Sequence, residues 1–380
     1  MRWVSGVVGA LLLAVVLWDA FETVILPRRV NRRFRITRLF YRGTWRPWRA
    51  TARLLPARRR EAFLAFYGPL SLLLLLAVWA GGIVVAFGLL HWAAGSALAL
   101  AGGVPGFGSD VYMSGTTFFT LGLGDVVPRS TFAKTLTVLE AGIGFAFLGI
   151  VIGYLPVIYQ GFSRREVTIS LLDARAGSPP TASELLRRHS AEEQRDALRE
   201  LLHEWERWAA DVLESHLSYA ALAYFRSQHN NQSWLAALTV ILDTSALVMV
   251  GLEGVCMRQA ALTFAMARHA VVDLAQVFGT PPTPPPLDRL PEAELARLRG
   301  LLAVGGMRMR QGEAELVERL AGLRRMYEPY VVALAAYLAV PLPPWVRAVE
   351  RPDNWQTSAW DRQPGPPRTG APPRPTTDHF

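Results

Sequence analysis

Long apolar stretches dominate the first half of the chain, and each is a candidate to cross a lipid bilayer. A membrane-spanning helix needs about 20 mainly apolar residues, and three stretches reach that length: approximately 3–26, 63–92 and 131–159. Asp19 and Glu22 lie near the end of the first stretch, where we expect the inner membrane interface. A cleaved secretory signal peptide is the alternative for this stretch, although no convincing cleavage site follows it. The pattern predicts three transmembrane helices.

A fourth apolar stretch, residues 233–250, also suits a buried helix of a globular domain. Asp243 stands in its middle, and the next predicted helix, about 258–278, carries Arg258 and Arg268. A helix with those charges does not suit a return passage through the bilayer. We therefore expect 233–250 to be the buried helix of an all-α domain, while insertion of 234–251 into the membrane stays open as the alternative.

The sequence after about residue 163 is typical of helices separated by proline-rich breaks. Thr181 and the glutamate three residues later form a capping-box pattern, which opens a helical stretch reaching about Arg226. Residues 281–286 are mostly proline and break the pattern, and helical segments resume from about 292 to 339. The last thirty residues hold seven prolines and little apolar content, so we expect a disordered tail.

Composition argues against a wholly soluble chain, because 51% of the residues are apolar and only 19% are charged, against about 25% charged in an ordinary soluble domain. The net charge of +9 comes from one block, since residues 28–60 hold thirteen arginines and no acidic residue. A basic protein often binds nucleic acid, but this block lies between two apolar stretches, as cytoplasmic loops of membrane proteins do. We therefore expect no nucleic-acid partner.

The arginine block also sets the predicted orientation in the cell membrane, because short arginine-rich loops stay in the cytoplasm. The N-terminus then lies outside, residues 95–129 face outside, and everything after about residue 163 is cytoplasmic. The arginines of 28–60 recur every three or four residues, which is also the spacing of a voltage-sensing helix. Because the block is very polar and contains Pro47, we favour an interfacial helix that binds anionic lipid headgroups.

The segment 109–128, between the second and third apolar stretches, carries the most specific pattern in the chain. Its first part, about Ser109–Phe119, has a capping start at Ser109 and Asp110, continues with mostly apolar residues and predicts a short re-entrant helix. Residues 120–125 then read Thr-Leu-Gly-Leu-Gly-Asp, and the alternate glycines disfavour a helix. Glycine adopts positive φ without strain, so alternating glycine and other residues can turn successive carbonyl groups to one side. Rings of such carbonyl oxygens replace the hydration shell of a K⁺ ion.

This segment resembles the selectivity filter of the potassium channel superfamily. The family pattern is Thr-x-Gly-Tyr-Gly-Asp between two membrane spans, and residues 120–125 follow it except at Leu123, which replaces the tyrosine. Some two-pore-domain members of the family also carry leucine there. The resemblance covers about residues 63–160. It implies a homotetramer around one pore, passive conduction of K⁺, and no cofactor other than the permeant ion.

Candidate site residues follow from the resemblance and from charges within the apolar stretches. The expected ion-coordinating residues, of which the first four hold K⁺ and the last completes the filter, are Thr120, Leu121, Gly122, Leu123 and Gly124. Asp125 is expected to supply negative charge at the outer mouth. Glu140 is costly inside a membrane, and we expect it to face the cavity or to brace the filter from behind. Gly142, Gly144 and Gly149 are candidate gating hinges, with close helix packing as the alternative.

The predicted fold class is an all-α membrane protein with three transmembrane helices, a pore loop and a helical cytoplasmic domain. The expected segments are an N-terminal transmembrane helix (1–27), a basic cytoplasmic or interfacial segment (28–62), a two-helix pore domain with re-entrant loop 109–128 (63–160), a helical cytoplasmic domain (161–280), a proline-rich linker with a helical extension (281–345) and a disordered tail (346–380).

No catalytic motif is found in the sequence, so no enzyme activity is expected, and the ligand of the cytoplasmic domain stays unnamed. Two alternatives to a potassium-selective channel remain open. One is a weakly selective cation channel, because Leu123 lacks the tyrosine hydroxyl that usually braces the filter. The other is a non-conducting membrane sensor or scaffold, whose helical domain binds a protein partner.

Overall fold

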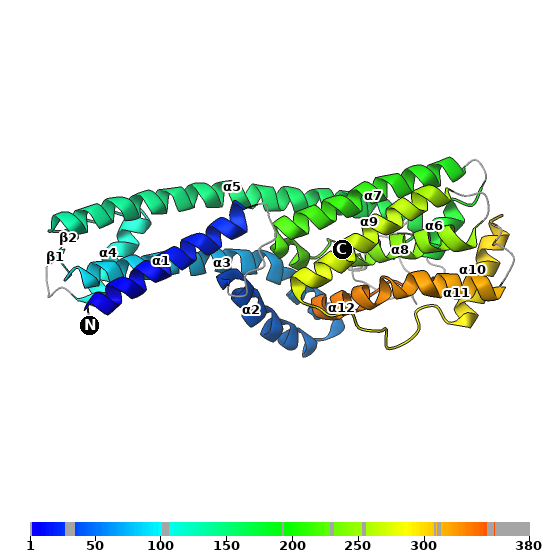
Figure 1. Ribbon diagram of the computed structural model, residues 1–380, viewed down its shortest axis with the longest axis horizontal. Helices are drawn as coiled ribbons and strands as arrows, with labels where there is room; N and C mark the ends of the chain where they lie inside the picture. Colours follow the sequence, from blue (N-terminus) through cyan, green and yellow to red (C-terminus); the bar gives the residue numbers. More distant parts are fainter. Residues whose placement is uncertain are drawn as a thin grey trace, which may run out of the picture. The chain divides into compact units, whose positions relative to one another are not determined.

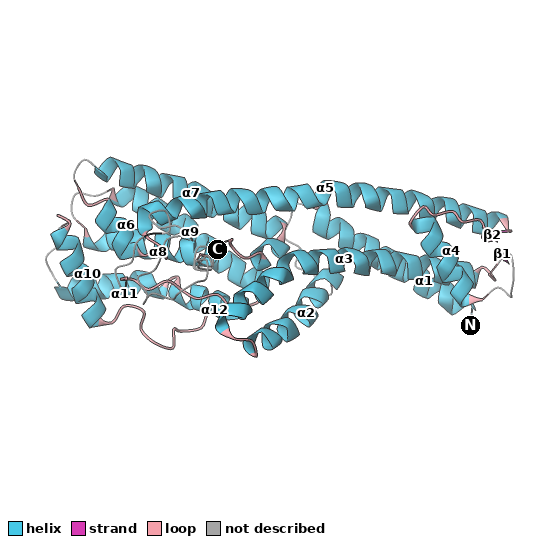
Figure 2. Cartoon of the chain, turned by 180° about the vertical axis from the view of Figure 1, so that it is seen from behind, coloured by secondary structure: helices cyan, strands magenta, loops and turns pink. Residues whose placement is uncertain are grey.

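The computed structural model describes residues 2–26, 35–96, 98–100, 106–191, 194–228, 232–252, 256–307, 309, 313–347 and 353. The chain divides into two compact units, Met1–Gln160 and Gly161–Phe380. Figure 1 shows the elements in chain order, and Figure 2 shows that helices form nearly all of the described chain. The arrangement within each unit follows from where the sequence places its apolar residues.

Three long helices of the first unit correspond to the apolar stretches of the sequence. They are α1 (Arg2–Val24), α3 (Ala57–Ala93) and α5 (Thr131–Ala176), whose last residues belong to the second unit. Each is long and apolar enough to cross a membrane. α1 packs along α3 (Figure 1), and a Cβ added at Gly9 would lie 2.8 Å from the carbonyl oxygen of Ala86. Small residues permit such close contact between membrane helices.

The middle of the arginine block forms α2 (Ile36–Arg53), an amphipathic helix that precedes α3. Its aromatic residues face α3: Tyr41 and Trp45 are buried, and the ring of Trp48 stacks on Phe63 with 4.4 Å between centroids. Residues 27–34, which include the start of the arginine block, lie outside the described residues. The placement of α2 against α3 agrees better with an interfacial helix than with a separate voltage-sensing span.

The pore loop between α3 and α5 consists of β1 (Leu98–Leu100), α4 (Phe107–Phe118) and β2 (Val126–Pro128). α4 begins two residues before the predicted Ser109, whose hydroxyl oxygen accepts a hydrogen bond from the Gly106 amide at 2.8 Å and stabilises the first turn. β1 and β2 pair antiparallel. The sequence did not predict this short sheet, because three-residue strands carry too few positions for a periodic signal.

The second unit is a bundle of helices around α8 (Trp234–Gly251), in which every residue except Ala236 and Met249 is buried. Its neighbours are α6 (Ala182–Arg188), α7 (Arg195–Ser218), α9 (Met257–Phe278), α11 (Glu313–Arg325) and α12 (Glu328–Leu338), and α10 (Glu292–Val304) packs on α6. α8 is also long and apolar enough to span a membrane. Burial inside the bundle accounts for its composition, and the guanidinium of Arg289 pairs with Asp243 at 2.7 Å.

The helical stretch expected from Thr181 to Arg226 is interrupted in the structure. The hydroxyl oxygen of Thr181 caps α6 by accepting a hydrogen bond from the Glu184 amide at 3.3 Å, as predicted. α6 then stops early because neighbouring side chains satisfy its last carbonyl groups. His189 Nδ1 lies 2.8 Å from the Leu185 carbonyl oxygen. α7 follows separately, and a short 3₁₀ helix, η2 (Ala220–Tyr224), ends the region.

Part of the tail that was expected to be disordered from residue 346 is packed against the bundle. Val346 and Asp353 are buried. The Asp353 carboxylate accepts a hydrogen bond from Arg188 at 2.5 Å and a longer one from Arg347 at 3.4 Å. Both arginines are ionic partners of Asp353, and the amino-acid composition of the tail does not predict these contacts. Residues 348–352 and 354–380 lie outside the described residues.

Candidate functional site

The segment 120–125 leaves the C-terminal end of α4 through a tight turn. The Leu121 amide donates a hydrogen bond to the Thr116 carbonyl oxygen at 2.8 Å. Thr120, Gly122 and Gly124 then have positive φ angles of 57°, 56° and 79°, whereas Leu121 and Leu123 between them do not. Successive residues of opposite φ turn their carbonyl groups toward the same side, which is the arrangement that the glycine spacing predicts. The structure therefore brings the expected filter residues together in one alternating segment.

Thr120 holds this conformation without the freedom of glycine. A positive φ costs a residue with a Cβ about 1–2 kcal/mol, so the surrounding turn has to impose it. The Thr120 amide donates to the Thr117 carbonyl oxygen at 3.0 Å, one of the bonds that hold the turn. Strained backbone of this kind is concentrated at functional sites.

The side chains of the filter segment have few contacts within a single chain. Leu121 and Leu123 are 60% and 62% exposed. A Cβ added at Gly122 or Gly124 would have no atom within 4 Å. Large apolar side chains and an irregular backbone, exposed together in a membrane-embedded loop, indicate a surface that another protein surface covers.

A hydrogen bond joins α4 to Asp125, at the expected outer end of the filter. The Tyr112 hydroxyl donates to Asp125 Oδ2 at 2.9 Å. The sequence assigned Asp125 to the outer mouth but gave Tyr112 no role. No sequence signal singles out Tyr112, because α4 carries four other hydroxyl residues: Ser109, Ser114, Thr116 and Thr117. Tyr112 thus links α4 to the residue that follows Gly124.

Glu140 is completely buried in the structure. Ser114 of α4 is within hydrogen-bond distance of both Glu140 Oε1 and the Val84 carbonyl oxygen, the latter at 2.7 Å. His91 Nε2 lies 3.9 Å from Glu140 Oε2. Ser114 and His91 were not identified from the sequence. This position matches the bracing alternative for Glu140, because the carboxyl group contacts the helix that carries the filter.

The three candidate hinge glycines differ in their surroundings. A Cβ added at Gly144 would collide with the carbonyl oxygen of Phe118, at the end of α4. A Cβ at Gly142 or Gly149 would have no atom within 4 Å. The packing alternative therefore describes Gly144, which lies against the end of the pore helix. A hinge at Gly142 or Gly149 stays a prediction.

A second buried polar cluster joins the first three helices of the unit. Asp19 Oδ2 accepts hydrogen bonds from the Trp79 indole at 3.0 Å and from the Thr37 hydroxyl at 2.6 Å. Arg35 Nε lies 3.8 Å from Asp19 and 3.5 Å from Glu22. The two acidic residues of the first apolar stretch thus contact residues of α3 and the beginning of α2, which accounts for charges inside an otherwise apolar helix.

Comparison with known proteins bears on part of this unit. Residues 72–160 match the model of a protein family described as "Ion channel". No curated protein and no solved structure gave a match to the chain. The matched residues contain most of α3, the whole pore loop and the first part of α5. Together with the long apolar helices, the match makes the protein an all-α, multi-pass membrane protein. Residues 72–160 are a two-helix ion-channel pore domain of the potassium channel superfamily.

Proposed function

We propose that four copies of this chain form a potassium-selective channel that conducts K⁺ passively across the cell membrane. The observation that carries the proposal is the alternation of φ at Thr120, Gly122 and Gly124 between two long apolar helices. In a ring of four such segments, carbonyl oxygens from Thr120 to Gly124 replace the water around a dehydrated K⁺ ion. Asp125 adds negative charge at the outer mouth and attracts cations.

The fourfold assembly is supported by the exposure of the filter segment. One chain supplies one pore loop, so a closed pathway requires symmetric copies around an axis. In the assembled tetramer, the exposed side chains of Leu121 and Leu123 then contact neighbouring protein chains instead of water. Because short arginine-rich segments stay in the cytoplasm, the arginines of α2 support a cytoplasmic position for the end of α2 that leads into α3. The N-terminus is then outside and the second unit is cytoplasmic, where it is available to regulate conduction.

Ion flux through the purified protein tests the proposal. Full-length protein is reconstituted in liposomes and K⁺-driven uptake of radioactive Rb⁺ is measured. Gly122→Ala and Gly124→Ala place a Cβ on residues with positive φ, so we expect flux to fall to the level of empty liposomes. Gly300→Ala, in α10 with no atom within 4 Å of the added Cβ, is the matched control. Native mass spectrometry checks that each variant still assembles. Undiminished flux in both filter variants would refute the assignment.

A weakly selective cation channel is the second candidate, and Leu123 is the observation that favours it. Leucine at this position has no hydroxyl to brace the filter, and its side chain is 62% exposed. Reversal potentials in mixed Na⁺ and K⁺ solutions separate the two candidates, because a weakly selective pore gives values near zero in symmetric total cation. Complete absence of flux would instead favour the non-conducting sensor.

A further inference from the structure

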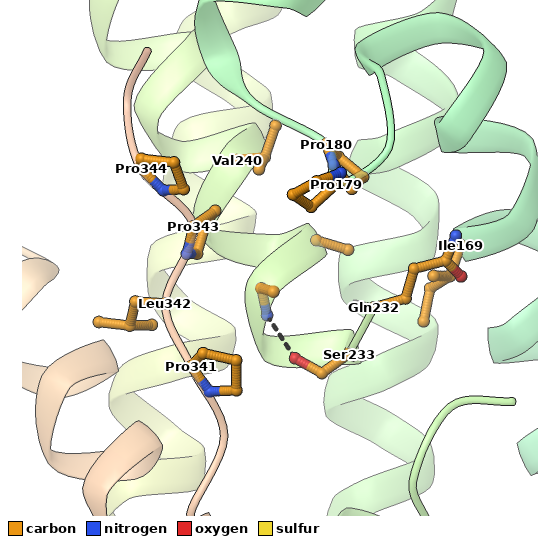
Figure 3. A pocket seen from close by; sticks show the side chains of 12 residues that line it. Ile169, Pro179, Pro180, Gln232, Ser233, Val240, Pro341, Leu342, Pro343 and Pro344 are labelled. Atoms are coloured by element: carbon orange, nitrogen blue, oxygen red, sulfur yellow. Dashed lines mark hydrogen bonds between the residues drawn. The ribbon is translucent and has the colours of Figure 1, made fainter. Parts of the chain in front are cut away.

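The second unit contains an apolar pocket that the proposed channel function does not use. It has a volume of about 240 Å³ and lies between the end of α5, the start of α8 and the chain after α12. Figure 3 shows Pro343 and Pro344 along one side of the pocket and Gln232 beside Ile169 on the other. We propose that this pocket binds a small neutral molecule with a flat apolar ring and an amide-like edge.

The residues that line the pocket favour a ligand with a flat apolar ring. Pro179 and Pro180 and three prolines of 341–344 line it, together with Ile169 and Val240. Proline rings are rigid and lie flat against aromatic rings, as in the recognition of proline-rich peptides by aromatic-lined grooves. None of the lining side chains is charged. Burying an unpaired charge here would be costly, so the pocket favours a neutral ring over an ion.

The amide of Gln232 selects the polar edge of the ligand. The Gln232 side chain is only 9% exposed, and neither Oε1 nor Nε2 has a hydrogen-bond partner in the part of the chain that the structure describes. Buried polar groups are nearly always hydrogen-bonded, and leaving one unpaired costs about 1–3 kcal/mol. An amide offers one acceptor and two donors side by side. A ligand edge with an adjacent donor and acceptor, such as a carboxamide, satisfies both atoms.

The other polar side chain at the pocket already has a structural role. The hydroxyl oxygen of Ser233 accepts a hydrogen bond from the Ala236 amide at 3.0 Å and caps α8. The ligand's polar edge is therefore expected at Gln232. Apolar pockets with a few convergent polar groups are the usual form of small-molecule sites. This inference does not depend on ion conduction, since it concerns residues of the second unit alone.

Binding of benzamide to the full-length protein in detergent tests the proposal. Saturation-transfer NMR titrations compare benzamide with toluene, which lacks the amide, and with benzoate, which is charged. We expect saturable binding of benzamide and at least about tenfold weaker binding of benzoate, because the lining offers no cation. Ala236→Phe fills the pocket, since Ala236 lines it and is only half-buried, and is expected to abolish binding.

Two glutamine variants separate the amide from general effects on folding. Gln232→Leu keeps the size of the side chain and is expected to weaken benzamide binding about tenfold, with toluene binding unchanged. Gln276→Leu, an exposed position of α9 outside the pocket, is the matched control and should bind as the wild type does. The proposal is overturned if the wild type shows no saturable benzamide binding, which indicates a water-filled pocket, or if Gln232→Leu binds benzamide equally well.

Discussion

The hydroxyl of Tyr112 and the carboxylate of Asp125 are joined by a hydrogen bond of 2.9 Å, which ties the pore helix to the outer end of the filter. The pair is exposed, yet it connects the helix to a strained backbone segment. Tyr112→Phe removes the bond and keeps the ring. We expect relative Na⁺ permeability to rise, by up to about tenfold for a net loss of about 0.5–1.5 kcal/mol. Reversal potentials measure the change.

The control for this variant is Tyr330→Phe, which removes a hydroxyl from α12 in the second unit and should leave selectivity unchanged. A wild-type permeability ratio in Tyr112→Phe would mean that the hydrogen bond does not stabilise the filter.

The surroundings of Gly144 predict that α5 tolerates a side chain there less well than at its other glycines. In Gly144→Ala the new Cβ meets the Phe118 carbonyl oxygen, so the end of α4 has to shift. Overpacking of this kind costs about 1–3 kcal/mol. We expect a lower thermal midpoint of the assembled channel and loss of Rb⁺ flux. Gly142→Ala and Gly149→Ala, where the added Cβ has open space, should retain the wild-type midpoint.

This comparison also separates packing from hinge motion. If Gly142→Ala or Gly149→Ala keeps its thermal midpoint but loses flux, the hinge prediction for that residue gains support. Equal stability of all three variants would contradict the close approach of α5 to α4.

Glu140 is expected to stabilise the pore helix through its contact with Ser114. Glu140→Ala creates a cavity beside Ser114 and removes its buried hydrogen-bond partner. The loss of this partner costs about 1–3 kcal/mol of stability. Glu140→Gln keeps an oxygen acceptor at the same distance along the side chain. We therefore expect the thermal midpoint in detergent to fall for the alanine variant and to stay near the wild-type value for glutamine. The reverse order would exclude the bracing role.

The burial of His216 predicts that the stability of the second unit depends on pH. Burial, together with the positive charge of the Arg165 guanidinium, whose Nη1 lies 3.2 Å from Nε2, lowers the pKa of His216 from its ordinary value of 6.5 to about 3. The unfolded chain therefore binds the proton more tightly than the folded chain. The contribution of His216 to the free energy of unfolding is fully present above about pH 6.5 and decreases as the pH falls from 6.5 toward 3.

Hydrogen exchange of peptides from α7, measured between pH 7 and pH 4 and corrected for the intrinsic exchange rate, tests this expectation. His216→Gln removes the titrating group, so its protection should depend less on pH. His203→Gln is the control, because the His203 side chain is 59% exposed. Identical pH dependence in wild type and His216→Gln would show that other groups cause the effect.

The sequence predicted those features that depend on local pattern. The length of the apolar stretches gave the three long helices of the first unit, and glycine spacing gave the alternating backbone of 120–125. The α6 cap at Thr181 followed from its neighbours in the chain. Burial of 233–250 inside a bundle was also expected, because the charges of the next helix oppose a return passage.

The features that the sequence missed depend on residues that meet only in three dimensions. Tyr112 and Asp125 are thirteen residues apart and lie on different elements. His91 reaches Glu140 from α3, with the pore loop between them in the chain. α6 ends early because the side chains of His189 and Ser190 are hydrogen-bonded to its last carbonyl groups. Such bonds compete with the backbone bonds of a longer helix. No periodic signal marks such contacts.

The bond from the Trp79 indole to Asp19 has a practical consequence for isolating the pore. Trp79 belongs to the segment that matches the ion-channel family, whereas Asp19 lies well before it. A fragment trimmed to residues 72–160 would leave the Trp79 indole N–H without its acceptor and would expose the face of α3 that α1 covers. The smallest piece of this protein that can be expected to fold as a channel therefore begins at the first helix.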